Sequence, residues 1–183
     1  MINYEPQSHI FVLTGDDYPW DIDFSKFSAL GKRNSSNFGP GCTATEDDLY
    51  RPIRVGWHGE RAVGWTIGGQ MPNYAYKQNG IPNDFIETTS RGEQYTIDVK
   101  TTRTDKLWIV YKNEAGTVLP LKCDVYWGVK LLHESITKRE AVMQIYGVIG
   151  REAVITYKPR RSPRGRHWNY EIPLVDLLPF DID

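Results

Sequence analysis

The sequence has little cysteine, no long apolar run and almost no net charge. Its two cysteines, Cys42 and Cys123, have none of the paired spacing of a zinc site, so two reduced thiols are expected. No stretch approaches the roughly 20 apolar residues that span a bilayer, and the N-terminus lacks a basic segment followed by an apolar run. We therefore expect a cytoplasmic protein without a membrane segment.

Two classes of enzyme also lack support. No glycine-rich phosphate loop is present, so a nucleotide cofactor is not indicated. The histidines lack a metal-ligand spacing, and neither cysteine has a nearby histidine pattern for nucleophilic catalysis. His58, beside Glu60, could assist at a site, but a lone histidine on a helix is more often structural. The formal net charge of −1 does not by itself indicate a polyanion partner, so any case for nucleic acid must rest on local charge.

The chain has the size and composition of one globular domain. Its 183 residues are 40% hydrophobic and 25% charged. A chain of this length and composition can bury a hydrophobic core without disulfides or structural metals. We expect a single domain over residues 1–183, divided into an N-terminal arm (1–50), a core (53–157) and a basic loop with the C-terminal segment (158–183).

The pattern predicts one helix followed by a sheet. Apolar spacing favours a helix from Ile53 to Gly68, which the glycine pair 68–69 would end. Later segments are rich in β-branched and aromatic residues, and together they predict an α+β fold with a mixed sheet. The predicted strands are NDFIETT (83–89), QYTIDVKTT (94–102), KLWIVY (106–111), KCDVYWGVKLL (122–132), AVMQIYGVI (141–149) and AVITYK (153–158).

The strand "YTIDVKTT" carries opposite charges at alternate positions. Asp98 and Lys100 lie two residues apart and so share one face of a strand, while Ile97 and Val99 share the other. Alone, this pair would indicate an edge strand with an incidental ion pair. However, Asp84 begins the preceding strand, and a hairpin would bring it beside the second strand.

Two carboxylates with a lysine beside them suit metal-assisted hydrolysis. Asp84 and Asp98 can hold Mg²⁺ through oxygen ligands, and Lys100 can orient or help activate a water. A metal so placed supports cleavage of a phosphodiester bond. A third carboxylate, Glu60, lies in the helix within "GERAV"; alone it would be read as a solvated glutamate.

The order of these motifs resembles the PD-(D/E)xK nuclease superfamily, which includes restriction endonucleases, phage nucleases and Holliday-junction resolvases. The resemblance extends from roughly Ile53 to Glu152 and implies a restriction-endonuclease-like core, a central mixed sheet flanked by helices. Two departures are visible: Asn83 separates Pro82 from the first aspartate, and the second acid is aspartate where glutamate is commoner.

The resemblance also implies roles for particular residues. Mg²⁺, for which Mn²⁺ is expected to substitute, would be bound by Glu60, Asp84, Asp98 and the main-chain carbonyl of Val99. Lys100 would act on the attacking water.

Several polar residues near these motifs have two interpretations. Thr101 and Thr102 either bond a phosphate or simply suit a strand. Gln144, on a later strand, is an accessory candidate, because some relatives place a polar residue in the site there. Asp124 is expected to support the fold through a cap-like or turn hydrogen bond rather than by binding metal.

A basic segment near the C-terminus is the candidate DNA-binding surface. Pro and Gly interrupt it, which predicts irregular structure. Its cations suit phosphate contacts, and arginine can also read guanine edges; otherwise it is a solvated loop. The candidate DNA-binding residues are Lys158, Arg160, Arg161, Arg164 and Arg166.

Three hypotheses follow. The first is a Mg²⁺-dependent endonuclease that hydrolyses DNA through a metal-activated water, acting as a homodimer because two sites are the simplest way to cut both strands. The second is a DNA-binding or assembly protein that keeps the fold without cutting. The third is an unrelated α+β domain with a chance motif. Restriction, phage, repair and junction-resolving roles are not separated, nor are DNA and RNA.

Overall fold

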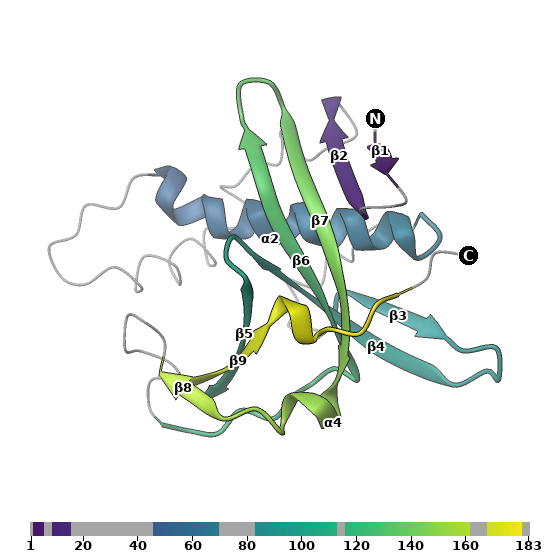
Figure 1. Ribbon diagram of the computed structural model, residues 1–183, viewed down its shortest axis with the longest axis vertical. Coiled ribbons are helices and arrows are strands. Elements are labelled where there is room, and N and C mark those ends of the chain that lie inside the picture. Colours follow the sequence, from purple (N-terminus) through teal and green to yellow (C-terminus); the bar gives the residue numbers. More distant parts are fainter. Residues whose placement is uncertain are drawn as a thin grey trace, which may run out of the picture.

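The protein is an α+β molecule with a mixed, curled sheet and few helices (Figure 1). The computed structural model describes residues 2–5, 9–15, 46–69, 83–112, 116–161 and 168–180. No helix in this part of the chain is long and apolar enough to cross a membrane. The elements are β1 (Ile2–Glu5), β2 (Ile10–Thr14), α2 (Glu46–Thr66), β3 (Phe85–Thr88), β4 (Gln94–Thr102), β5 (Lys106–Lys112), β6 (Val125–Ser135), β7 (Glu140–Gly150), α4 (Arg151–Val154), β8 (Pro159–Arg161), β9 (Trp168–Pro173) and the 3₁₀ turn η4 (Leu174–Asp176).

The main sheet has six strands in the order β1-β2-β7-β6-β4-β3. Adjacent strands of this sheet pair antiparallel, except β4 and β6. These two run parallel, from Ile97 opposite Val125 to Thr102 opposite Lys130. A parallel pair needs a connection that returns the chain to the starting end. Here that connection contains β5, which joins a separate three-stranded sheet in the order β5-β9-β8.

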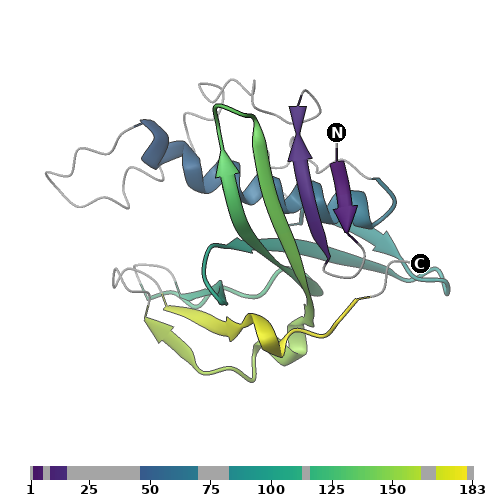
Figure 2. The same ribbon diagram turned by 45° about the horizontal axis from the view of Figure 1, so that its top comes forward.

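Helix α2 lies across one face of the main sheet, as both views show (Figures 1 and 2). Alternation along β4 turns Ile97 and Val99 toward the helix, where they join one buried cluster with Val63 of α2 and Val129 of β6. The helix ends at Thr66, just before the glycine pair that predicts its end, and both Gly68 and Gly69 have positive φ. Its observed start at Glu46 is seven residues earlier than Ile53, where the apolar pattern begins.

The small sheet packs against the opposite face of the main sheet. Leu107 and Ile109 of β5 form a second buried cluster with Tyr126 of β6. Gly128 of β6 permits this approach, because a Cβ added there would lie 3.0 Å from Cδ1 of Leu107 and 2.2 Å from Cδ1 of Leu177. Among the described elements, therefore, a long helix covers one face of the main sheet and strands cover part of the other.

The N-terminal residues are more than an arm packed on the core. β1 and β2 form an antiparallel pair, and β2 pairs with β7 from Ile10 opposite Gln144 to Thr14 opposite Glu140. Phe11 and Leu13 are buried in the main core. These strands thus belong to the sheet itself; residues 16–45 lie outside the described part of the chain.

The predicted strand AVITYK is wrong. Residues 151–154 form the helical turn α4, and just after it Thr156 Oγ1 donates back to the carbonyl of Ala153 at 2.7 Å. Val154 is buried and Tyr157 packs on the same cluster, a spacing of three that one helical turn satisfies. The β-branched composition indicated a strand, but these local hydrogen bonds and the burial of Val154 favour a turn.

The basic segment, predicted to be irregular, is regular in part, since Pro159–Arg161 form β8.

Helix α2 approaches β4 closely at Gly59. A Cβ added at Gly59 would lie 2.0 Å from Thr101 Oγ1 and 3.2 Å from Thr101 Cβ, whereas at Gly56 it would meet only Glu60 Oε1 at 3.9 Å. We expect Gly59→Ala to lower the free energy of unfolding by about 1–3 kcal/mol through overpacking. Gly56→Ala should be neutral or stabilising, because alanine favours a helix by about 1 kcal/mol over glycine.

Urea denaturation of both variants and of Gly59→Ala/Thr101→Ala measures these differences. Removing the Thr101 hydroxyl and methyl should restore part of the stability lost in Gly59→Ala, a non-additive effect. Equal stabilities for the two single variants would contradict the close contact.

Candidate active site

The β3–β4 hairpin brings Asp84 next to Asp98. The strands pair from Phe85 opposite Ile97 to Thr88 opposite Gln94, and Asp84 N donates to the carbonyl of Ile97 at 2.8 Å. Asp84 lies just before this paired segment, and its bonds to the Ile97 carbonyl and to Val99 N reach the two residues that flank Asp98. The hairpin predicted from the sequence is therefore present, and its open end carries two carboxylates.

Asp84 is held by the backbone of β4. Its Oδ2 accepts a hydrogen bond from Val99 N at 2.7 Å, and the residue is only 6% exposed. Strand β3 begins at Phe85, so the side chain of Asp84 bonds β4 just past the last strand pair. The N–H and C=O of one strand residue point to the same edge. The Val99 carbonyl, predicted as a metal ligand, therefore emerges on the edge of β4 that faces Asp84.

Lys100 forms an ion pair with Oδ2 of Asp98. The side chain of Lys100 is 34% exposed and that of Asp98 18% exposed. Burial alone would lower the pKa of Lys100, but the charge and hydrogen bond of Asp98 and the charge of Asp84 together raise it. The charges of both aspartates therefore stabilise the ammonium form of Lys100.

Strand β6 adds Tyr126, which sequence reasoning missed, and the segment just before this strand adds Cys123. Tyr126 of β6 lies directly beside Asp98 in the parallel register, and its hydroxyl accepts a hydrogen bond from Cys123 N at 3.4 Å. Burial, with the nearby charges of Asp98 and Asp84, raises the pKa of Cys123 to about 12. A thiol with such a pKa is protonated at neutral pH, which agrees with excluding a thiolate nucleophile.

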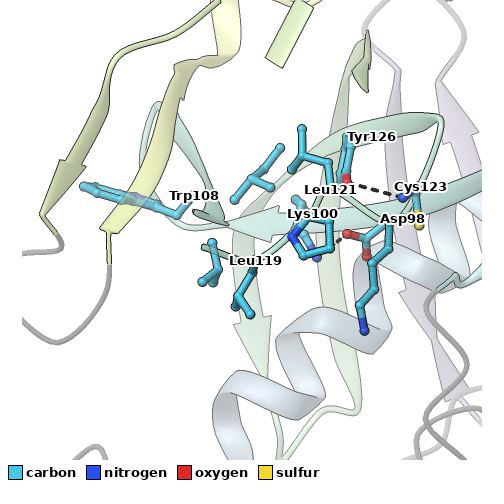
Figure 3. A pocket seen from close by; sticks show the side chains of 11 residues that line it. Asp98, Lys100, Trp108, Leu119, Leu121, Cys123 and Tyr126 are labelled. Carbon is cyan, nitrogen blue, oxygen red and sulfur yellow. Dashed lines mark hydrogen bonds and ion pairs between the residues drawn. The ribbon is translucent and has the colours of Figure 1, made fainter. Parts of the chain in front are cut away.

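These residues open into a pocket of about 330 Å³ between β4, β5 and the segment before β6 (Figure 3). Asp98 and Lys100 lie at one end of the pocket and Trp108 at the other, with Leu119 between them in this view.

Glu60 is not brought into this group. Thr101 turns toward α2, where its hydroxyl donates to the carbonyl of Gly56 at 3.4 Å. Strand alternation then directs Asp98 and Lys100 to the opposite face. Glu60 is 5% exposed within the helix, and no three His, Cys, Asp or Glu side chains of the described residues are grouped to hold a metal ion. Its role as a ligand stays a prediction.

The accessory candidates have structural contacts. Thr102 Oγ1 accepts from Thr104 N at 3.1 Å in the turn after β4. Gln144 of β7 lies opposite Lys130, which pairs with Thr102, so it is two strands, roughly 10 Å, from β4. Asp124 Oδ2 accepts from both Thr96 N at 2.9 Å and Thr96 Oγ1 at 2.8 Å. Asp124 therefore supports the fold, as predicted, but through bonds to a residue 28 positions away on β4 rather than through a local cap or turn.

The basic segment is described only in part. Lys158 is exposed, as are Arg160 and Arg161 on β8; Arg164 and Arg166 lie outside the described residues. Arg160 pairs with Asn169 of β9, which pairs with Val110 of β5. Arg160 therefore projects from the same face of the small sheet as Val110 and Trp108.

A second charged cluster joins α2 to the far end of β6. Glu134 Oε1 accepts from Arg54 Nε at 2.7 Å and lies 2.9 Å from His58 Nε2. All three side chains are nearly buried, at 5%, 8% and 0% exposed, respectively. His58 is thus a structural residue, which is the more common role of a lone histidine on a helix. The pairing with Glu134 joins positions 76 residues apart, beyond any local pattern.

Comparison with known proteins adds no relative: no family model, curated protein or solved structure matches the chain.

Proposed function

We propose that the protein is a Mg²⁺-dependent endonuclease of the PD-(D/E)xK type, with a restriction-endonuclease-like core, that hydrolyses DNA phosphodiester bonds. The observation that carries this proposal is the grouping of Asp84, Asp98 and Lys100 where the β3–β4 hairpin opens. Asp98 and Lys100 line a pocket, and the exposed cations of β8 lie on the adjoining small sheet.

The donor set fits a hard divalent cation. Two carboxylates and the Val99 carbonyl are all oxygen ligands, and Mg²⁺ is commonly bound through one or two carboxylates plus substrate oxygens and water. When bound, Mg²⁺ supplies Lewis-acid polarisation of the phosphoryl group and activation of water. Asp84 and Asp98 would hold the ion, with Glu60 a more distant candidate.

The chain's own residues divide the remaining work. The hydrogen bond from Val99 N fixes the orientation of Asp84 before substrate arrives. Lys100 carries a positive charge beside both aspartates and is suited to orient the attacking water and to offset the negative charge that develops on the phosphoryl group.

A plasmid assay tests this proposal. The purified protein with Mg²⁺ or Mn²⁺ should nick or linearise plasmid DNA, and EDTA should abolish the reaction. Asp98→Asn should also abolish it, because an amide is a poor ligand for a hard cation. Asp105→Asn removes a carboxylate that is 82% exposed and should leave cleavage intact. Cleavage that survives EDTA or Asp98→Asn would overturn the mechanism.

A DNA-binding or assembly protein that does not cut is the second candidate. One observation favours it: the described residues hold two clustered carboxylates rather than three. Salt-dependent DNA binding without turnover under any divalent metal would support this candidate. If cleavage occurs, sedimentation of the active species measures whether it is the expected homodimer.

A further inference from the structure

We propose that the pocket beside Asp98 and Lys100 takes an unstacked nucleobase, so that the substrate is single-stranded or locally unpaired DNA. This inference rests on the proposed nuclease function and names the substrate class of that site. It is carried by the composition of the pocket, by the placement of Trp108 and by the face that Trp108 shares with Arg160.

The pocket is divided into a charged part and an apolar part. Asp98, Lys100 and Lys122 contribute the charges, while Trp108, Leu119 and Leu121 form apolar wall. Its volume of about 330 Å³ lies at the lower end of the range for small-molecule sites, roughly 300–1,000 Å³. A ligand that matches both parts has a flat apolar group joined to an anion, as a nucleotide does.

Trp108 is suited to act as a stacking surface. Along β5 the residues on either side of it, Leu107 and Ile109, are buried in the second core cluster, whereas Trp108 is only half-buried and turns to the other face. Its side chain lines the pocket at the end away from the ion pair (Figure 3). Stacking of a base on an aromatic side chain contributes about 1–3 kcal/mol and tolerates any base.

A base inside a duplex cannot reach this surface. Its faces are covered by neighbouring base pairs, so it must leave the stack before Trp108 can contact it. A protein that contacted only duplex phosphates would have no use for an apolar hollow beside its catalytic group. The pocket therefore favours strands whose bases are already unpaired, for which the cost of unstacking is smallest.

The strand also has a path away from the site. Arg160 projects from the same face of the small sheet as Trp108, two strands from β5 and thus roughly 10 Å away. A single strand with a phosphate at Lys100 and a base at Trp108 would continue toward Arg160. A basic track combined with an aromatic surface is the usual arrangement for binding single strands.

Binding measured in EDTA tests this inference without requiring cleavage. Fluorescence anisotropy compares labelled dT6 with a hexamer of abasic deoxyribose phosphates of equal charge. We expect the protein to bind dT6 roughly 5- to 150-fold more tightly, the ratio that one stacked base supplies. Trp108→Leu, which keeps apolar bulk but removes the flat ring, should reduce this ratio to near one.

Two variants serve as controls. Trp108→Phe keeps an aromatic ring and should keep most of the preference for dT6. Trp168→Leu removes a tryptophan that is 42% exposed on β9 and should leave the ratio unchanged. Circular dichroism confirms that each variant is folded.

The outcomes separate this inference from the proposed function. Equal binding of the two hexamers, or a ratio unchanged in Trp108→Leu, would overturn the nucleobase site even if the protein cuts DNA. A ratio that depends on Trp108 in a protein that never cuts would support the nucleobase site and refute only the nuclease activity.

Discussion

Replacing Lys100 with methionine is expected to slow DNA hydrolysis by about 10²–10³-fold, the usual effect of removing one preorganised group that stabilises developing charge. Methionine keeps much of the length of the side chain but removes the ammonium that pairs with Asp98. Single-turnover cleavage at saturating Mg²⁺ measures the rate of the chemical step. Binding of uncut DNA in EDTA should change far less than this rate.

Lys130 supplies the matched control. It lies on the neighbouring strand β6 and pairs with Asp105, a residue that is 82% exposed. An exposed pair of this kind contributes only about 0–1 kcal/mol, so Lys130→Met should preserve both folding and cleavage. A folded Lys100→Met that cuts at the rate of the unmodified protein would remove Lys100 from the mechanism.

Replacing Glu134 with glutamine is expected to lower the free energy of unfolding by about 3–5 kcal/mol, because it leaves the Arg54 charge buried without its partner. The side chains of Glu134 and Arg54 are 5% and 8% exposed, so solvent screens them little. Urea denaturation measures the change. Glu140→Gln alters a side chain that is 35% exposed, with His133 4.0 Å away, and should cost about 0–1 kcal/mol.

The same cluster predicts how stability depends on pH. Burial alone would raise the pKa of Glu134, but the hydrogen bonds and charges of His58 and Arg54 lower it to about 2 from an ordinary 4.5. Its contribution is therefore present above pH 4.5 and lost as the pH falls toward about 2. Burial lowers the pKa of His58 from 6.5, so stability also falls as the pH drops below 6.5.

Denaturation of the unmodified protein and of Glu134→Gln across this pH range checks the assignment. The difference in unfolding free energy between them should shrink as the pH falls from 4.5 toward about 2. A constant difference would show that the ionisation of Glu134 does not stabilise the protein.

The local features were predictable from the sequence. Alternation alone places Asp98 and Lys100 on one face of β4, and the short turn after Thr88 predicts the hairpin that brings Asp84 to them. Both the shared face and the hairpin depend on residues that are close in the chain, and the two-residue period of a strand fixes which of those residues share a face.

The missed features depend on contacts between distant segments. Tyr126 lies beside Asp98 only because β4 and β6 pair in parallel with a particular register, which no local pattern specifies. The face that α2 presents to β4 includes the close approach of Gly59 to Thr101, a contact between distant segments, so the helix pattern alone could not tell whether Glu60 would reach the aspartates. The ion pair between Arg54 and Glu134 joins positions 80 residues apart, so no local pattern indicates that these side chains are buried.

The strand order of the small sheet constrains when the pocket can form during synthesis. β9 lies between β5 and β8, although both of these strands leave the ribosome before it. Until Trp168–Pro173 emerge, β5 lacks the strand with which it pairs in the small sheet, and the wall that carries Trp108 is incomplete. A growing chain can therefore fold the β3–β4 hairpin early, while the complete pocket must wait for residues near its C-terminal end.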